Sequence, residues 1–210
     1  MYRVFCFTIM ENILKKYEYI ILFSVLGIGL LLRLAAVIHG LPYALFGDEL
    51  VQVAAGFSLL AEKTLRANFA FYYLPPLFSY LLAPSFGIIG LGGLLTGFFH
   101  SLVDFQNYVF LHKEHFLIVG RVFSALFGVG TIFILHHFAK RAFGVPVALL
   151  ASFIMAFDFL HLHESQVGRF WTPAVFFIVG AMYSMWRLVE EPTRKWYLLA
   201  ALSLGLGFGM

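Results

Sequence analysis

Long apolar stretches alternate with short polar segments along most of the chain. A hydrocarbon core about 30 Å thick needs about 20 apolar residues for each crossing helix. Five stretches approach that length, and they cover residues 19–38, 118–139, 145–162, 171–188 and 196–210. The pattern therefore predicts an all-α, polytopic transmembrane helical bundle of about five spans.

A sixth apolar segment, residues 75–103, can either cross the membrane or dip into it and return. Cytoplasmic loops carry an excess of Lys and Arg, and a dip places eight such residues on the cytoplasmic side, whereas a full crossing places six there. The eight are Arg3, Lys15, Lys16, Lys140, Arg141, Arg187, Arg194 and Lys195. Pro84 and the glycines between residues 87 and 97 also disfavour one uninterrupted helix. We therefore expect a membrane-dipping segment.

This topology gives one transmembrane domain over residues 1–210. Residues 1–18 form a cytoplasmic tail, and residues 39–117 form a long extracytoplasmic loop with juxtamembrane helices. The last residues, LSLGLGFGM, are an apolar, glycine-rich run without a closing polar flank. We therefore expect the natural chain to continue beyond residue 210.

Within the long loop, residues 50–65 have the pattern of an amphipathic helix lying at the membrane interface. Leu50, Phe57 and Leu60 share one face with two alanines, whereas Gln52 does not lie on it. Loops carry binding and catalytic residues more often than spanning helices do. The long loop is therefore the first place to look for chemistry.

Composition agrees with a membrane protein and excludes a separate soluble domain. Hydrophobic residues make up 61% of the chain, charged residues make up 12%, and the mean hydropathy is +0.90. The net charge of +3 comes from basic residues scattered at segment ends, so we expect a lipid bilayer as partner and no nucleic acid. Cys6 is the one cysteine, which excludes a Cys-rich metal site. A multi-pass protein of this kind belongs in the plasma membrane of a prokaryote or the endoplasmic reticulum of a eukaryote.

The first candidate for chemistry is the sequence Gly47-Asp48-Glu49, ten residues after the first span. A carboxylate at the membrane surface can act as general base on an acceptor hydroxyl, or it can hold a divalent cation such as Mg²⁺ or Mn²⁺. The alternative is structural, because adjacent carboxylates also stabilise a helix N-terminus. No other cofactor is expected.

Basic residues that face the same compartment form the second candidate. They are Lys63, Arg66, Lys113, Arg121 and Arg169. A sugar carried on a lipid phosphate leaves a phosphate anion behind at the membrane surface, and cations at that depth would hold it. Each of these side chains can alternatively contact lipid headgroups alone.

Further polar residues lie near segment ends. His161, His163 and Glu164 form a set of metal ligands or, more simply, a polar rim of a substrate pocket, and the structural alternative is a cap of the span at the membrane interface. Tyr73, in the sequence YYLPPL, belongs to an aromatic belt or stacks on a sugar. Asp158 falls inside a predicted span and should face protein or a water-filled cavity.

At the opposite ends of the spans, His136 and His137 lie beside two basic residues and are interpreted as marking the cytoplasmic boundary.

Three stretches resemble the GT-C membrane glycosyltransferases, in particular the group similar to dolichyl-phosphate-mannose protein mannosyltransferases and aminoarabinose transferases. The acidic motif and juxtamembrane helix of that group are similar to GDELVQVAAGFSLLAEKTL, and its segment that returns to the membrane is similar to YYLPPLFSYLLAP. The next stretch is GRVFSALFGVGTIFILHHFAKRAFGVPVALLASFIMAF, which resembles a span, a basic turn and a second span. The order and spacing of the three stretches carry the likeness.

The resemblance implies that Asp48 or Glu49 sits at the catalytic centre. It implies a polyprenyl- or dolichyl-phosphate-linked sugar as donor, with mannose or another hexose or pentose as the sugar. The acceptor would be a protein, lipid or glycan, and the anomeric carbon would be inverted. Where many relatives have a second acid in a pattern such as Arg-x-Asp, this chain has Gly168-Arg169-Phe170-Trp171, and Glu164 is the candidate replacement.

A second hypothesis is a non-catalytic membrane protein, either a transporter or a scaffold. A transporter predicts inverted repeats and ionisable residues near the middle of the membrane. The sequence contains no convincing repeat, and most of its ionisable residues lie at segment ends. These observations favour the enzyme.

Overall fold

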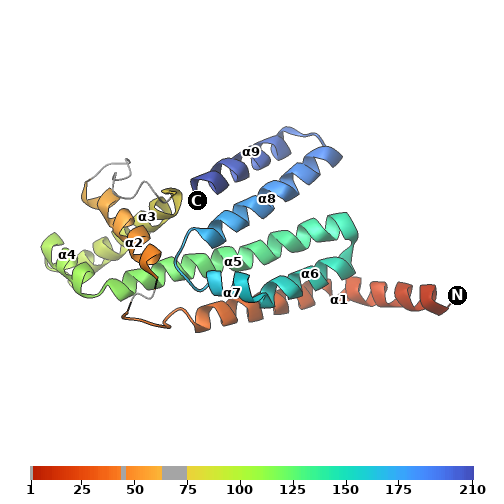
Figure 1. Ribbon diagram of the computed structural model, residues 1–210, viewed down its shortest axis with the longest axis horizontal. Helices are drawn as coiled ribbons and strands as arrows, with labels where there is room; N and C mark the ends of the chain where they lie inside the picture. Colours follow the sequence, from red (N-terminus) through yellow and green to blue (C-terminus); the bar gives the residue numbers. More distant parts are fainter. Residues whose placement is uncertain (1, 44–45, 63–74) are drawn as a thin grey trace.

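A computed structural model describes residues 2–43, 46–62 and 75–210, with side chains from residue 13 onward within these ranges. The described residues form nine α-helices and no strand, which confirms the predicted all-α class (Figure 1). The helices are α1 (Tyr2–Ala35), α2 (Gly47–Ala61), α3 (Leu77–Leu95), α4 (Leu102–Leu111), α5 (Lys113–Phe143), α6 (Val145–Phe157), α7 (Phe159–Glu164), α8 (Trp171–Glu190) and α9 (Arg194–Gly209).

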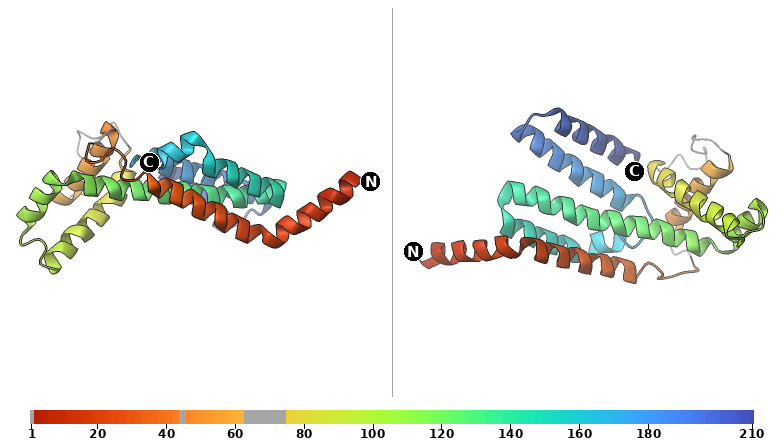
Figure 2. Two further views of the ribbon diagram at one scale, coloured as in Figure 1. Left: turned by 90° about the horizontal axis from the view of Figure 1, so that it is seen from below. Right: turned by 180° about the vertical axis from the view of Figure 1, so that it is seen from behind.

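Helices α1, α5, α6, α8 and α9 form an elongated bundle, and α2, α3 and α4 gather around the start of α5 (Figures 1 and 2). Helices α1 and α5 run antiparallel. Glu18, in the first half of α1, contacts Nε2 of His136 at 3.0 Å and Nζ of Lys140 at 2.9 Å, near the end of α5. Just after α1, the carbonyl oxygen of Val37 accepts from Nη1 of Arg121, near the start of α5, at 2.8 Å. We call the second location the Asp48 end of the bundle and the first the Glu18 end.

The antiparallel pair determines where the segment between α1 and α5 begins and finishes. Because α1 ends and α5 begins at the Asp48 end, the chain leaves the bundle and re-enters it at one and the same end. A segment between α1 and α5 that dips into the membrane and returns requires that both helix ends lie at the same end of the bundle. Which side of a membrane that end faces, and how deeply α3 enters the bilayer, remain predictions from the charge pattern.

Helix α3 corrects one expectation, because Leu77–Leu95 is a single continuous helix that contains Pro84. Two of its glycines do not break the helix but allow aromatic rings to pack closely against it. A side chain at Gly90 would collide with the ring of Phe105, and one at Gly93 would collide with the ring of Phe99. The turn to α4 follows at Gly97, whose φ of 76° is favourable for glycine.

Four helices of the described part are long and apolar enough to span a membrane: Ile13–Ala35 within α1, then α3, α5 and α8. One other predicted span is shorter than expected, because α6 has 13 residues and extends about 20 Å. Helix α9 has 16 residues and covers nearly the whole of the predicted span 196–210. The predicted span 145–162 breaks at Asp158, whose carboxylate accepts from the amide of His161 at 2.8 Å and caps α7. The expectation of one uninterrupted helix over residues 145–162 is therefore wrong, and Asp158 lies at the break between α6 and α7.

Helix α2 joins the Asp48 end to the core. Its buried face contains Glu49, Gln52, Val53, Gly56 and Leu59, with one alanine, whereas Leu60 of the predicted apolar face is exposed. Gln52 is buried because its side-chain oxygen accepts from the hydroxyl of Ser79 on α3 at 2.6 Å.

The main apolar cluster packs α2, α3 and α5 together with Met210. Its fully or nearly fully buried members are Val53, Phe78, Leu82, Phe86, Phe116, Leu117, Phe170 and Met210.

A buried polar cluster connects three helices at the Glu18 end. His136 is fully buried between Glu18 of α1 and Ser152 of α6, whose hydroxyl lies 3.2 Å from Nδ1. Its ring therefore holds three helices together at the end of the bundle that also carries Lys140. That this end marks the cytoplasmic boundary stays a prediction. Arg141 and Glu190 form an ion pair at the same end, 2.8 Å apart.

Gly128 of α5 provides a stability prediction. A methyl group at its Cα would overlap the hydroxyl of Ser165 and lie 2.9 Å from Nε of Arg33. Over-packing of a buried position costs about 1–3 kcal/mol, so Gly128→Ala is expected to lower the thermal unfolding midpoint in detergent. Gly27→Ala is the matched control, because Gly27 lies in α1 with nothing within 4 Å, and its midpoint should stay the same or rise slightly. Equal midpoints for Gly128→Ala and wild type would contradict the close packing.

Candidate functional site

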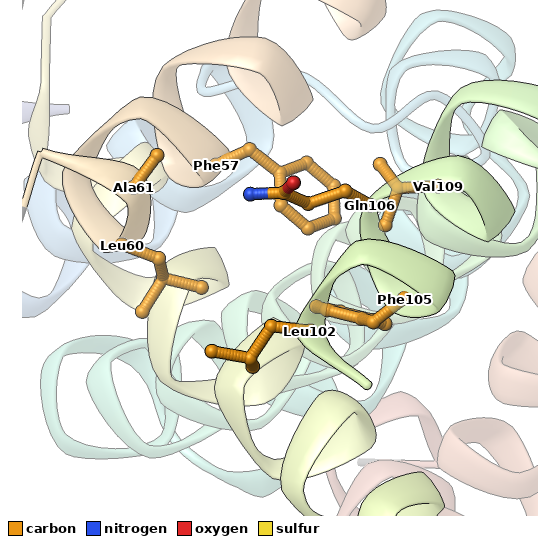
Figure 3. A pocket seen from close by; sticks show the side chains of 7 residues that line it. All are labelled: Phe57, Leu60, Ala61, Leu102, Phe105, Gln106 and Val109. Carbon is orange, nitrogen blue, oxygen red and sulfur yellow. The ribbon is translucent and has the colours of Figure 1, made fainter. Parts of the chain in front are cut away.

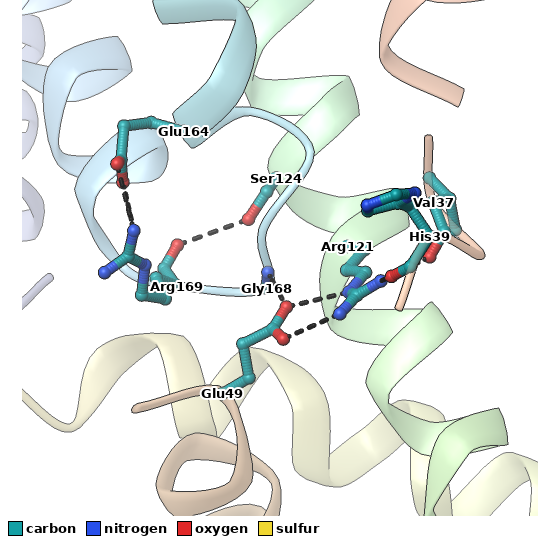
Figure 4. A network of polar contacts seen from close by, with 8 residues as sticks. All are labelled: Val37, His39, Glu49, Arg121, Ser124, Glu164, Gly168 and Arg169. Carbon is teal, nitrogen blue, oxygen red and sulfur yellow. Dashed lines mark hydrogen bonds and ion pairs between the residues drawn. The ribbon is translucent and has the colours of Figure 1, made fainter. Parts of the chain in front are cut away.

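The centre of the site is an ion pair between α2 and α5 (Figure 4). Glu49 lies in the first turn of α2, and its side chain is completely buried. Its Oε1 accepts from Nε of Arg121 at 2.8 Å, and its Oε2 accepts from Nη2 of Arg121 at 2.8 Å. A two-point contact of this kind fixes both partners in orientation.

Backbone groups complete the coordination of the pair. Nη1 of Arg121 donates to the carbonyl oxygens of Val37 and His39, each at 2.8 Å. The backbone amide of Gly168, in the loop between α7 and α8, donates to Oε1 of Glu49 at 2.6 Å. A buried charge pair is favourable only when its remaining polar atoms are satisfied. Here hydrogen-bonding groups come from four places: α2, α5, the segment that follows α1, and the α7–α8 loop.

Gly168 allows the α7–α8 loop to approach this closely. A Cβ atom at Gly168 would lie 3.1 Å from the backbone nitrogen of Arg121 and 3.4 Å from Oε1 of Glu49. The loop is also held by Ser124, whose hydroxyl donates to the carbonyl oxygen of Arg169 at 3.2 Å. The loop therefore presents the side chain of Arg169 at a fixed position beside α2.

Asp48 and Arg169 form a second layer that solvent can reach. The side chain of Asp48 is 48% exposed, and its Oδ2 lies 3.7 Å from Nη1 of Arg169. Nη2 of Arg169 donates to the two carboxylate oxygens of Glu164 at 2.9 and 3.0 Å, while Nε is buried without a hydrogen-bond partner among the described residues. The guanidinium lies over the ring of Phe46, 5.1 Å from its centroid. The layer thus combines an accessible carboxylate with a cation that has N–H groups left for a ligand.

Two cavities lie near these residues. One of about 400 Å³ is beside the ion pair and is lined by Ala36, His39, Phe46, Arg121, His163, Gln166 and Val167. The other, of about 370 Å³, is lined by Phe57, Leu60 and Ala61 of α2 and by Leu102, Phe105, Gln106 and Val109 of α4 (Figure 3). Among the described residues that line the second cavity, only Gln106 has a polar side chain. The described lining of the first cavity is more polar, and this favours the first cavity as the place for a polar substrate.

The structure brings six of the residues predicted for the site to one place. They are Asp48, Glu49, Arg121, His163, Glu164 and Arg169. Three others, Lys63, Arg66 and Tyr73, lie outside the described residues.

Two predicted roles do not agree with the contacts. Both carboxylate oxygens of Glu49 accept charge-assisted hydrogen bonds, so Glu49 is not free to act as base or metal ligand. Arg121 is 3% exposed and gives four hydrogen bonds within the protein, so it is not free to hold a lipid phosphate. The carboxylate of Glu49 turns to α5 and makes no capping hydrogen bond, and the N-cap position belongs to Phe46, although both acidic residues do lie in the first turn of α2.

His161 and His163 do not converge on a metal. His161 is buried, and its Nδ1 accepts from Nη2 of Arg33 at 2.8 Å, whereas His163 faces the ring of Phe46, with the centroids 5.8 Å apart. Burial, together with the charge of Arg33, lowers the pKa of His161 to about 4, so its ring is neutral at pH 7. The polar-rim alternative fits His163.

Sequence reasoning missed Arg33. Its side chain is fully buried in α1, and it donates to the carbonyl oxygens of Gly29 at 2.9 Å and Ala156 at 3.3 Å besides its contact with His161. These bonds tie α1 to α6 and α7, and through α7 they support the loop that carries Arg169. The only signal in the sequence was one charged residue inside a predicted apolar span.

Comparison with known proteins identifies the family. Residues 58–210 match the sequence profile of the dolichyl-phosphate-mannose-protein mannosyltransferases. The chain belongs to this family. The match covers well over half of the chain and includes Arg121, Glu164 and Arg169, but it begins after Asp48 and Glu49 and therefore does not test the acidic pair. Together with four helices that can span a membrane, family membership makes this mannosyltransferase-family chain an integral membrane protein.

Two similar proteins of Bacillus subtilis (strain 168), YycA and YkcB, carry mannosyltransferase names. YycA is 31% identical over 87 residues, which cover 41% of this chain and 13% of YycA. YkcB is 29% identical over 85 residues, which cover 40% of this chain and 12% of YkcB. The matched segments thus span only a small part of both mannosyltransferase relatives. No solved structure matches the chain.

Proposed function

We propose that the protein transfers a sugar from a polyprenyl- or dolichyl-phosphate donor to a hydroxyl group at the extracytoplasmic face of the membrane. The sugar is mannose or another hexose or pentose, and the acceptor is a protein, lipid or glycan. One observation carries the proposal: a chain of the mannosyltransferase family holds the accessible carboxylate of Asp48 beside Arg169, on a helix start that the buried Glu49–Arg121 pair fixes in place.

In this proposal Asp48 is the general base. Its carboxylate accepts the proton of the acceptor hydroxyl while the hydroxyl oxygen bonds to the anomeric carbon. The bond from that carbon to the phosphate oxygen breaks at the same time, and the lipid phosphate leaves with the electron pair. Attack from the side opposite to the leaving group inverts the anomeric carbon.

Arg169 is the best-supported cation for the leaving phosphate. Nη1 lies no closer than 3.7 Å to Asp48, so its N–H groups are available to phosphate oxygens. Charge-assisted donors stabilise negative charge as it develops on a leaving group. Glu164 keeps the guanidinium in place because its carboxylate accepts hydrogen bonds from Nη2, the nitrogen other than the one that faces Asp48.

A divalent cation, Mg²⁺ or Mn²⁺, would bind Asp48 rather than Glu49, because hard cations need free carboxylate oxygens. Asp48 is the only member of the acidic pair with oxygens open to solvent. The cation would add positive charge beside the donor phosphate. Arg169 and the carboxylate of Asp48 would act in the same positions with or without it.

The proposal is tested with the intact protein purified into lipid nanodiscs. Radiolabelled sugar should pass from polyprenyl-phosphate donors to acceptor and should not pass from nucleotide sugars. If transfer stops with a chelator and returns with Mg²⁺ or Mn²⁺, the cation is supported. Transfer from nucleotide sugars alone would overturn the donor assignment, and solute uptake into proteoliposomes without any transfer would favour a transporter.

A further inference from the structure

The junction between α4 and α5 places two histidines and a glutamate around one point. Helix α4 ends at Leu111 and α5 begins at Lys113, so His112 alone forms the corner, with φ −125° and ψ 46°. This corner turns the His112 side chain back over the first turn of α5, where Glu114 and His115 lie. One nitrogen of each histidine and one oxygen of Glu114 lie within 4.8 Å of one another.

We propose that His112, Glu114 and His115 form a binding site for one late first-row divalent cation, of which Zn²⁺ is the representative. The site shares no residue with the Asp48 layer and is independent of the proposed sugar transfer.

The spacing of the donor atoms supports this site. Zinc bonds of about 2.1 Å in a tetrahedron separate the ligand atoms by about 3.4 Å, and Nδ1 of His112 lies 3.3 Å from Oε1 of Glu114. The rings of His112 and His115 are stacked, with an interplanar angle of 23° and centroids 5.7 Å apart, so the rings must rotate to turn both nitrogen lone pairs toward one ion. His112 and His115 are exposed, so small rotations can close the remaining distance. Two histidines and one carboxylate leave a fourth position for water.

Tyr108 supplies the orienting contact that histidine ligands of metals usually have. Its hydroxyl lies 2.8 Å from Nδ1 of His115, and its ring lies 4.7 Å from that of His112 and 5.7 Å from that of His115. When Nδ1 of His115 donates its proton to the tyrosine oxygen, Nε2 keeps its lone pair for a metal. A hydrogen bond of this kind fixes the tautomer and the ring orientation of a ligating histidine.

The donor set determines which cation the site prefers. Two imidazoles favour zinc, copper, nickel or cobalt, whereas magnesium, calcium and manganese prefer oxygen ligands. The cation proposed for Asp48 belongs to the second group. A bound metal would connect the C-terminus of α4 to the first turn of α5, whose His115 lies about 9 Å along the helix from Arg121.

The test measures metal binding to the full chain, purified in detergent without a histidine tag and freed of metal. Cobalt(II) should bind in one equivalent and give visible absorption bands typical of a low-coordinate site, and Zn²⁺ should displace it. His112→Ala, Glu114→Gln and His115→Ala should each weaken Zn²⁺ binding at least about tenfold, and Tyr108→Phe should weaken it by about tenfold because it removes the orienting contact.

His100→Ala is the matched control. His100 is exposed, and it lines the same cavity of about 420 Å³ as His112 and Tyr108, but it does not belong to the three-residue cluster. Its variant should bind Zn²⁺ as the wild type does. The proposal is overturned if wild-type protein binds neither metal at micromolar concentration, or if the His112 and His115 variants retain wild-type affinity.

Discussion

Asp48→Asn is expected to slow sugar transfer by about 10²- to 10⁴-fold, the usual contribution of a general base. The amide has nearly the same shape as the carboxylate but cannot take the proton of the acceptor. Asp48 is half exposed, and among the described residues its carboxylate makes one long contact, with Arg169, so the variant should unfold at the wild-type temperature. Transfer rates from a polyprenyl-phosphate sugar, measured together with the unfolding midpoint in detergent, check both statements.

Asp104→Asn is the control for this variant. Asp104 lies in the first turn of α4, and its side chain is 47% exposed, almost the same as that of Asp48. Its described contacts are with His100 and Ser101 and not with residues of the candidate site, so its variant should transfer sugar at the wild-type rate. Wild-type transfer by Asp48→Asn would remove Asp48 as the base and leave it a residue of the helix start.

Local cues in the sequence were sufficient to select residues that the fold brings together. Apolar runs predicted the bundle, and the charge pattern predicted that the chain returns between residues 39 and 117 to the end that it left. The acidic pair and Arg169 were selected because charged residues are costly near lipid and therefore stand out. The structure brings these residues together at the Asp48 end of the bundle.

The different environments of Asp48 and Glu49 could not be predicted from the sequence. Asp48 and Glu49 are adjacent, yet one faces solvent while the other faces Arg121, a residue 72 positions away. That choice depends on how α2 rotates against α5 and on a backbone amide that only the folded α7–α8 loop supplies. Gln52 is a second example. A polar side chain at this position predicts exposure to solvent, but in the fold the side-chain oxygen of Gln52 accepts a hydrogen bond from Ser79 on a neighbouring helix.

Glu49→Gln is expected to destabilise the protein by about 3–5 kcal/mol, the cost of leaving a buried charge without its partner. The carboxamide can accept at one atom only, so Arg121 loses half of its two-point contact, and its charge remains buried and uncompensated. The variant should therefore unfold at a lower temperature and lose sugar transfer together with folded protein. Unfolding followed by intrinsic fluorescence in detergent measures the first effect, and transfer per folded molecule measures the second.

A double-mutant cycle separates this explanation from a catalytic role of Glu49. Arg121→Met should cost about as much as Glu49→Gln, because it leaves the carboxylate buried alone. Glu49→Gln combined with Arg121→Met removes both charges, and its loss of stability should be smaller than the sum of the single losses. Additive losses would show that the two side chains do not stabilise each other. A Glu49→Gln protein with wild-type stability but no transfer would assign Glu49 to the reaction itself, whereas a fold-dependent loss leaves Asp48 as the one carboxylate of the pair that meets the substrate.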